Sequence, residues 1–165
     1  MLKFKKLRPD AIIPTYAHKG DAGMDLIAVE DAQWNPIFAV HCNASGQIIV
    51  GYKTMVKTGL AMSLPVGFEG MVRSKSGLAA KHNIFVTNSP GCIDSSYRGE
   101  IMVMLTCIGP LPTVSKVVAK GTKVAQLVIN KVESEMQVVE VEDLDETSRG
   151  EGGFGSTGDK HVAKQ

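Results

Sequence analysis

Glu100-Ile-Met-Val-Met-Leu-Thr-Cys107 is a nearly continuous apolar run, and this stretch decides the fold. Its composition and the Arg98-Gly99 break before it predict a β-strand in the core. Shorter β-rich runs recur along the chain between Gly, Pro and Asn residues, and their spacing predicts an all-β sandwich or barrel. The expected strands are Leu2–Leu7, Leu26–Val29, Ile37–His41, Gln47–Val50, Thr54–Lys57, Leu60–Leu64, Gly70–Ser74, Ile84–Thr87, Glu100–Cys107, Val114–Val118, Val124–Ile129 and Met136–Val141. One short helix is expected, over Ser76–His82.

The composition is that of a globular domain without a strong net charge. Of 165 residues 44% are hydrophobic, and 18 Lys and Arg nearly cancel 17 Asp and Glu. This balance provides no basic field for a polynucleotide backbone, so a nucleic-acid partner is not expected. A small nucleotide remains allowed, because a local pocket can supply the charge that it needs.

The cysteines and the apolar runs indicate the compartment. Cys42, Cys92 and Cys107 are odd in number and form no Cys-x-x-Cys pair, which argues against a disulfide framework or a zinc site. We expect all three to be small buried hydrophobic residues. The sequence contains no secretory signal and no apolar run of membrane-spanning length, so we expect a cytoplasmic protein without a membrane partner.

Two regions differ from the regular strand pattern. Residues 30–52 hold the only tryptophan, Trp34, together with an Asn-Ala-Ser-Gly turn, and we interpret them as an inserted hairpin that could dock a protein partner. Residues 140–148 are acidic and poor in core residues, as is typical of a linker. The expected organisation is a β domain over 1–140, including the insertion, and a linker with a C-terminal arm over 141–165.

The arm is rich in glycine and contains groups that suit a nucleotide. Arg149-Gly-Glu-Gly-Gly-Phe154-Gly-Ser-Thr-Gly158 combines glycines, which let a backbone approach an anion, with an arginine fork and one aromatic face. It could close over phosphates and a base. The alternative is a frayed Gly-rich tail, the usual result for such a composition at a terminus.

Residues 88–100 lie between two strong strands, where binding residues tend to be placed. They offer an amide in Asn88, a carboxylate in Asp94 and an aromatic hydroxyl in Tyr97. Asp94 could activate water as a general base. The alternative is an Asx-turn aspartate with a tyrosine packed on the sheet, and turn statistics taken alone favour it.

Three further segments carry polar groups at suggestive places. Asp25 could act through water held by Mg²⁺ or could cap backbone N–H groups. Ser76, at the start of the expected helix, could bind phosphate or act as an N-cap. Gln126 is polar within an apolar strand and needs a partner, either structural or a ligand. The four histidines form no ligating pattern, so a metal held by protein side chains is not expected.

These segments, in this order, resemble the homotrimeric dUTP diphosphatase (dUTPase) family. The five family motifs correspond to Ala22–Ala28, Lys75–Ala79, Gly91–Glu100, Gly121–Leu127 and Arg149–Gly158. Each is weak alone, but five in register over almost the whole chain are specific. The resemblance implies a jelly-roll-like β fold, a homotrimer with shared active sites closed by the C-terminal arm, and Mg²⁺-dependent hydrolysis of dUTP to dUMP and pyrophosphate.

The third motif would hold the reacting end of the substrate, by this resemblance. Asp94 would activate the water that attacks the α-phosphorus, and Tyr97 would pack on the deoxyribose and exclude a 2′-hydroxyl. The residues implied to read the uracil edge are Asn88, Gly91, Cys92, Ile93 and Met102.

The other motifs would hold the phosphates and close the site. Asp25 would hold a water bound to Mg²⁺, while the metal itself is held mainly by the triphosphate. The implied phosphate-side residues are Lys75, Ser76, Gly77 and Gln126. In the arm, Arg149, Gly155 and Ser156 would bind substrate, with Arg149 and Ser156 on the distal phosphates, and Phe154 would stack on the uracil.

The chain departs from the family pattern in three places. Lys75 replaces the usual arginine of the second motif, and Arg73, two residues earlier, is a candidate to compensate. The fourth motif reads Gly121-Thr-Lys123 where an acidic residue and arginine are usual. Residues 30–52 lengthen the span between the first two motifs.

Two alternatives differ from dUTP hydrolysis. A dCTP deaminase needs a glutamate base in the third motif, where this chain has Asp94. A nucleotide-gated binding protein would use the insertion, and exposed Trp34 and Phe38 side chains would favour it.

Overall fold

The computed structural model describes residues 1–42, 48–108 and 117–153, and it describes residues 38–42 and 48–50 by their backbone alone. The chain divides into two compact units, Met1–Glu135 and Met136–Gln165. The described strands are β1 (Lys3–Lys6), β2 (Met24–Ile27), β3 (Asn35–Cys42), β4 (Ile48–Lys57), β5 (Leu60–Ser63), β6 (Phe68–Ser74), β7 (Ile84–Val86), β8 (Gly91–Ile93), β9 (Met102–Ile108) and β10 (Lys123–Lys131), and the helix is α1 (Ser76–His82).

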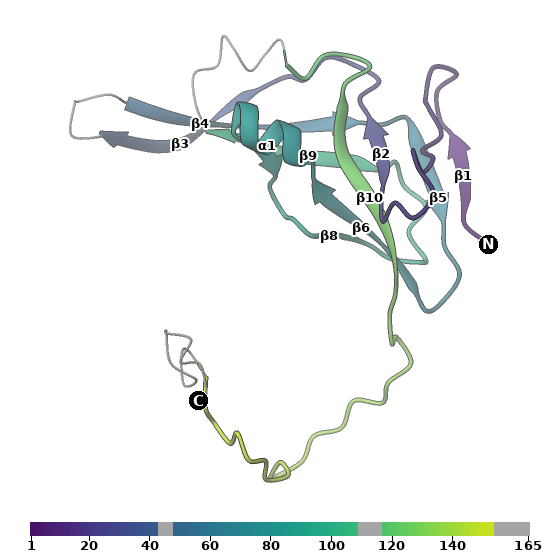
Figure 1. Ribbon diagram of the computed structural model, residues 1–165, viewed down its shortest axis with the longest axis vertical. Helices are drawn as coiled ribbons and strands as arrows, with labels where there is room; N and C mark the ends of the chain where they lie inside the picture. Colours follow the sequence, from purple (N-terminus) through teal and green to yellow (C-terminus); the bar gives the residue numbers. More distant parts are fainter. Residues whose placement is uncertain (43–47, 109–116, 154–165) are drawn as a thin grey trace, which may run out of the picture. The chain divides into compact units, whose positions relative to one another are not determined.

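The first unit is built from antiparallel sheets (Figure 1). One four-stranded sheet has the order β2-β10-β6-β8, the other has the order β3-β4-β9-β7, and β1 pairs with β5 in a separate ribbon. This architecture confirms the predicted all-β, jelly-roll-like fold with one short helix.

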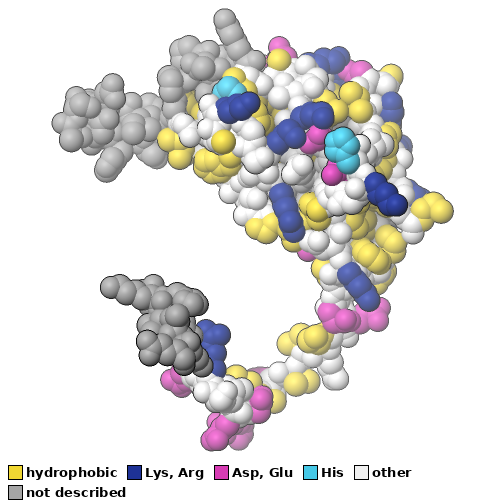
Figure 2. All heavy atoms as spheres, in the orientation of Figure 1, with side chains coloured by type: hydrophobic (Ala, Val, Ile, Leu, Met, Phe, Trp, Pro, Cys, Tyr) yellow, Lys and Arg dark blue, Asp and Glu magenta, His cyan; other side chains and the backbone are white. Residues whose placement is uncertain are grey.

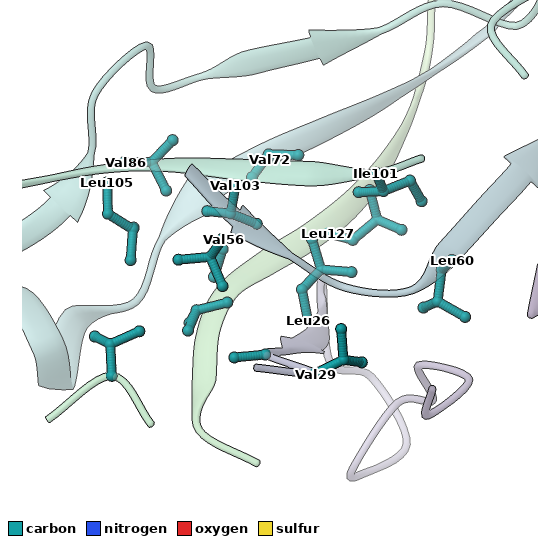
Figure 3. Close-up of a cluster of buried hydrophobic side chains, with 14 of the residues drawn as sticks. Leu26, Val29, Val56, Leu60, Val72, Val86, Ile101, Val103, Leu105 and Leu127 are labelled. Carbon is teal, nitrogen blue, oxygen red and sulfur yellow. The ribbon is translucent and has the colours of Figure 1, made fainter. Parts of the chain in front are cut away.

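The strand β9 alternates between the core and the surface. Val103, Leu105 and Cys107 are fully buried, whereas Met102 and Ile108 are exposed. Figure 3 shows Val103 and Leu105 in one cluster with side chains from strands of the opposite sheet. Burying each such side chain stabilises the fold by about 1.5–3 kcal/mol, so this strand is the centre of the core, as its sequence predicts.

The expected start of this strand at Glu100 is wrong by two residues. Pairing with β4 begins at Met102, opposite Lys57. The two residues before it bond elsewhere: the Glu100 carboxylate accepts the Gly59 N–H at 2.8 Å, and the Ile101 N–H donates to the Leu60 carbonyl at 2.7 Å. These bonds fasten the end of the loop that precedes β9.

The helix α1 spans the predicted residues, Ser76–His82. Its N-cap residue is Lys75, with an extended backbone and no side-chain cap bond, so the alternative of a serine N-cap is not what the structure shows. Asn83 ends the helix with a left-handed φ of 52° and donates its N–H to the Ala79 carbonyl. Leu78 is buried and fixes the helix to the core.

Residues 30–52 include β3 and the first part of β4, which pair antiparallel as a hairpin (Figure 1). The expected strands Gln47–Val50 and Thr54–Lys57 are parts of the single strand β4, because Gly51 between them pairs with both Ile37 and Ile108. Trp34 is half-buried and packs against the core, so it offers no exposed docking face. The side chain of Phe38 lies outside the described residues.

Three other strand expectations differ from the structure. Met136–Val141 forms no strand, because a lone segment has no neighbour to satisfy its backbone hydrogen bonds. Residues 117–118 of the expected strand Val114–Val118 are not in a strand, and residues 114–116 lie outside the described part. The expected loop 88–100 contains the short strand β8, which pairs with β6.

The described residues of the second unit, 136–153, form neither helix nor strand. Acidic side chains gather on this segment (Figure 2), and its apolar side chains are exposed, including Val138 and Leu144. No helix among the described residues has the length and apolar character needed to cross a membrane.

An ion-pair network links the segments that follow β1 and β2 to the end of β4 and to the segment before β10. Asp10 accepts hydrogen bonds from Lys120 Nζ at 2.6 Å and from Arg8 Nε at 3.1 Å. Glu30 bridges Arg8 and Lys57 at 3.5 and 3.4 Å. The bonds from Lys120 and Arg8 hold the pKa of Asp10 well below its usual range.

The Asp10→Asn variant should have a lower melting temperature than the wild type at pH 7, with a difference that shrinks in acid. A depressed carboxyl pKa stabilises the folded state above the unfolded value of about 3.9 and ceases to do so as the pH falls through the folded pKa. Thermal unfolding measured from pH 7 to pH 2 checks this. Asp145→Asn, in the exposed segment 136–153, is the control, and a difference between wild type and Asp10→Asn that stays constant with pH would contradict the network.

Candidate functional site

The loop between β7 and β9 forms one wall of a pocket with a volume of about 220 Å³. It is lined by Met55, Asn88, Cys92, Ile93, Asp94, Tyr97, Glu100, Ile101, Met102 and Met104. Six of these residues were predicted for a site from the sequence: Asn88, Cys92, Ile93, Asp94, Tyr97 and Met102. The structure therefore collects the amide, the carboxylate and the aromatic hydroxyl of this segment around one cavity.

Two glycines let the polar side chains of this pocket lie close to the backbone. A Cβ on Gly99 would overlap Tyr97 Oη and lie 2.6 Å from Cζ, so the ring folds over the position that a side chain at residue 99 would occupy. The Tyr97 hydroxyl then donates to the Glu100 carbonyl at 3.2 Å. A Cβ on Gly91, the remaining predicted residue of this segment, would lie 3.1 Å from Asn88 Nδ2. The space left at these two glycines therefore allows Tyr97 and Asn88 to face the cavity.

Sequence reasoning missed four lining residues, of which Glu100 and Ile101 end the loop. The other two are Met55 and Met104. They lie directly opposite each other on β4 and β9, and cross-strand partners share one face of a sheet. Met102 is two residues along β9 from Met104 and so lies on the same face. The available signal was the alternation within the apolar run: Met102 and Met104 alternate with buried residues and therefore face outward, where they extend the apolar wall of the pocket.

Cys92 is exposed, which corrects the expectation that it is buried, whereas Cys107 is buried as expected. The Cys92 thiol donates to Glu69 Oε2 at 3.0 Å and lies 3.8 Å from Asp94 Oδ1. The bond to Glu69, with burial and the negative charge of both carboxylates, raises the pKa of this thiol to about 11. Cys92 is therefore a protonated donor beside Asp94 at neutral pH. Cys42 lies outside the side chains that the structure describes.

A second group of predicted residues lies on the sheet that contains β2, β10 and β6. Gln126 is directly opposite Asp25 on one side and Arg73 on the other. Asp25 Oδ1 lies 2.8 Å from Lys75 Nζ, and Asp25 Oδ2 lies 2.8 Å from Lys123 Nζ. Burial opposes ionisation of Asp25, but the bonds from Lys123 and Lys75 outweigh it and lower its pKa.

Ser76 and Gly77 begin α1, directly after Lys75, and both are exposed. A Cβ on Gly77 would meet no atom within 4 Å, so the space beside it is open. These residues extend the exposed polar surface that begins at Lys75.

The two groups differ in charge and are separate within the first unit. No Lys or Arg lines the pocket among the described residues, whereas Asp94 and Glu100 both do. None of Asp25, Lys75, Lys123 and Gln126 lines it. The acidic pocket alone is thus poorly suited to a polyphosphate.

The arm residues are only partly described. Arg149 is exposed, and its Nε donates to the Gly152 carbonyl at 2.8 Å within a turn. Phe154, Gly155 and Ser156 lie outside the described residues.

Residues 9–158 match the dUTPase family profile, which is nearly the whole chain. The chain belongs to the dUTPase family. Among its relatives are proteins named deoxyuridine 5′-triphosphate nucleotidohydrolase. Those of Rhodococcus erythropolis, Clostridium kluyveri and Trichodesmium erythraeum are 40%, 43% and 45% identical over 157 residues. The match covers 95% of this chain and 85%, 97% and 98% of the respective relatives.

Solved dUTPase structures have the same fold. The dUTPase of Staphylococcus bacteriophage 80alpha, a variant bound to dUpNHpp, matches with a TM-score of 0.72 at 24% identity, covering 96% of this chain and 98% of that one. A variant of the dUTPase of phage phi11 of S. aureus, described with a structural Mg(II) ion, matches at 0.64 and 21% identity, covering 88% and 99%. At these identities the likeness shows the fold alone.

The environment of Cys92 in this dUTPase-family chain predicts slow thiol alkylation at neutral pH. Iodoacetamide reacts with thiolate, and the raised pKa leaves little of it below about pH 11. Replacing Glu69 with Gln removes the carboxylate whose hydrogen bond is the largest cause of the raised pKa and whose negative charge adds to it, so Glu69→Gln should react several-fold faster at pH 8. Mass spectrometry of the peptides reports Cys92 separately from Cys42 and Cys107. Equal rates for the two proteins would mean that Glu69 does not control the thiol.

Proposed function

We propose that this protein is a dUTP nucleotidohydrolase that converts dUTP to dUMP and pyrophosphate. One observation carries the proposal: the pocket gathers Asn88, Asp94 and Tyr97. The relatives that match 95% of this chain are named for this reaction. A general base, an amide and an aromatic ring are the groups needed to activate water, read a base and hold a sugar.

In the proposed reaction Asp94 orients a water molecule and accepts its proton. The water oxygen forms a bond to the α-phosphorus while the bond from that phosphorus to the bridging oxygen breaks, and pyrophosphate leaves with the electron pair. Cys92 lies beside Asp94 and carries its proton at neutral pH, so its thiol adds no negative charge next to this carboxylate.

The base and the sugar are proposed to lie against the remaining walls. Tyr97, seated over Gly99, would contact the deoxyribose where a 2′-hydroxyl needs space. The Asn88 amide and the backbone at Cys92, Ile93 and Met102 would read the uracil edge. Met55, which is exposed, and Met104, which is half-buried, supply apolar surface for the ring.

Mg²⁺ is proposed to arrive with the triphosphate as part of the substrate. Among the described residues no group of three or more His, Cys, Asp or Glu side chains could hold a metal ion. Asp25, assigned by the family pattern to a metal-bound water, has a lysine ammonium on each oxygen, and that environment does not fit a divalent cation. The ion would neutralise phosphate charge.

The complete site is proposed to form between subunits of a homotrimer. The support is electrostatic: the pocket carries carboxylates, and the lysines lie elsewhere on the same chain. A neighbouring subunit would bring Lys75, Ser76, Gly77 and Gln126 to the phosphates, and the arm would add Arg149, Phe154, Gly155 and Ser156. The free thiols of Cys92 and Cys107 are compatible with the proposed cytoplasmic location.

The function is tested by pyrophosphate release from dUTP, dCTP, dTTP and UTP, each with and without Mg²⁺. We expect selective cleavage of dUTP, and a loss of about a hundredfold or more in kcat for Asp94→Asn with dUTP binding retained. Binding of dUTP without release from any nucleotide would instead favour a nucleotide-gated binding protein.

The shared site is tested by co-expressing Asp94→Asn with Gln126→Ala and purifying mixed trimers through two tags. Each variant alone should be nearly inactive. In each mixed trimer one of the three sites would combine an intact Asp94 with an intact Gln126 from the neighbour, so about a third of the wild-type rate should return. A mixed preparation no more active than its components would place the site within one subunit.

A further inference from the structure

Asp25 binds two lysines at once and is only 18% exposed. Lys75 reaches it from the residue before α1, and Lys123 reaches it from the first residue of β10, each at 2.8 Å. The Lys75 and Lys123 side chains are 27% and 55% exposed, so both remain partly accessible to solvent. Both oxygens of the Asp25 carboxylate are thus engaged, while both lysine side chains remain partly open to a ligand from solvent.

The net charge of this cluster is positive, because one carboxylate neutralises only one of two ammonium groups. Gln126 lies directly opposite Asp25, and Arg73 lies directly opposite Gln126. Since cross-strand partners share a face, these side chains form a row that ends at the exposed Arg73 guanidinium. The row attracts anions and repels divalent cations.

A lysine ammonium is a mobile point charge on a flexible stem, unlike the planar fork of arginine. Lysine at both positions therefore gains from a fixed counter-charge that holds the stems in place. Both lysine pairs remain partly open to solvent, and such ion pairs add little to stability. Stabilising the fold therefore does not account for a carboxylate that binds two lysines.

We propose that Asp25 is a positioning residue that holds Lys75 and Lys123 as a paired cation site for the distal phosphates of the nucleotide. Lys123 is the new binding residue, and Asp25 acts through the lysines instead of through a metal-bound water. The inference rests on the proposed function. It assigns the lysines to the distal phosphates because neither lines the pocket that holds Asp94.

The test compares Lys123→Ala with Lys131→Ala, an exposed lysine at the other end of β10. Isothermal titration calorimetry gives the Kd of α,β-imido-dUTP and of dUMP for each protein, and steady-state kinetics give KM and kcat for dUTP. Loss of one charged contact should weaken α,β-imido-dUTP about tenfold and raise KM similarly. The affinity for dUMP, which lacks distal phosphates, should not change. Equal analogue affinity in the two variants would overturn the assignment of Lys123.

The Asp25→Asn variant separates positioning from charge and from metal binding. Removing a negative charge beside a phosphate site should strengthen anion binding if charge alone matters. We expect weaker binding of α,β-imido-dUTP, by several-fold, because the amide no longer holds the lysines. The defect should be the same at low and high Mg²⁺. Tighter binding, or a defect that high Mg²⁺ removes, would overturn the positioning role.

Two controls keep the outcomes distinct. Melting temperature and trimer mass measured for each variant identify loss of folding, and Asp25→Glu, which retains the counter-charge, should recover most of the analogue affinity. If the wild type releases no pyrophosphate from dUTP, the proposed function fails together with this inference. If the wild type releases pyrophosphate from dUTP but the variants do not show the expected changes in affinity, only this inference fails.

Discussion

The backbone of Ile101 is the point on which the arrangement of the pocket depends. Its N–H donates to the Leu60 carbonyl at 2.7 Å, and its carbonyl accepts the fully buried Thr58 hydroxyl at 2.6 Å. The Glu100 carboxylate adds a bond to Gly59. These contacts clamp the loop that carries Asp94 and Tyr97 to the β4–β5 connection. Leaving such buried groups unpaired costs about 1–3 kcal/mol each. The loop is therefore held in place by hydrogen bonds to residues 58–60.

Charge divides the chemistry of the chain into two places. The pocket has carboxylates and apolar walls, which suit a base, a sugar and a water to be deprotonated. The lysine pair on Asp25 has excess positive charge, which suits phosphates. A nucleoside triphosphate needs both, and the proposed homotrimer would supply them at one substrate.

The sequence predicted the strands that have a strong pattern and a partner within the chain. The apolar run in β9, the helix α1 and the pocket residues Asn88, Asp94 and Tyr97 were foreseeable from local signals. Cys92, Ile93 and Met102 were predicted only through the family resemblance. Met136–Val141 has a strand composition without a strand, because pairing depends on a neighbour that composition does not contain. Met55 was missed because it lies outside any motif and reaches the pocket only through the β4–β9 register. The double engagement of Asp25 was also hidden, since Lys75 and Lys123 are distant from it in sequence.

The glycine beneath Tyr97 has a consequence for how substitutions in this chain should be interpreted. Gly99 has no side chain that could touch a nucleotide, yet a single methyl there would overlap the phenol ring of Tyr97. The orientation of the Tyr97 ring thus depends on Gly99, a residue two positions away that has no functional side chain. A change at that position would produce an enzyme whose reactive atoms are all present but differently aimed, and screening only chemically functional residues would not reveal the cause.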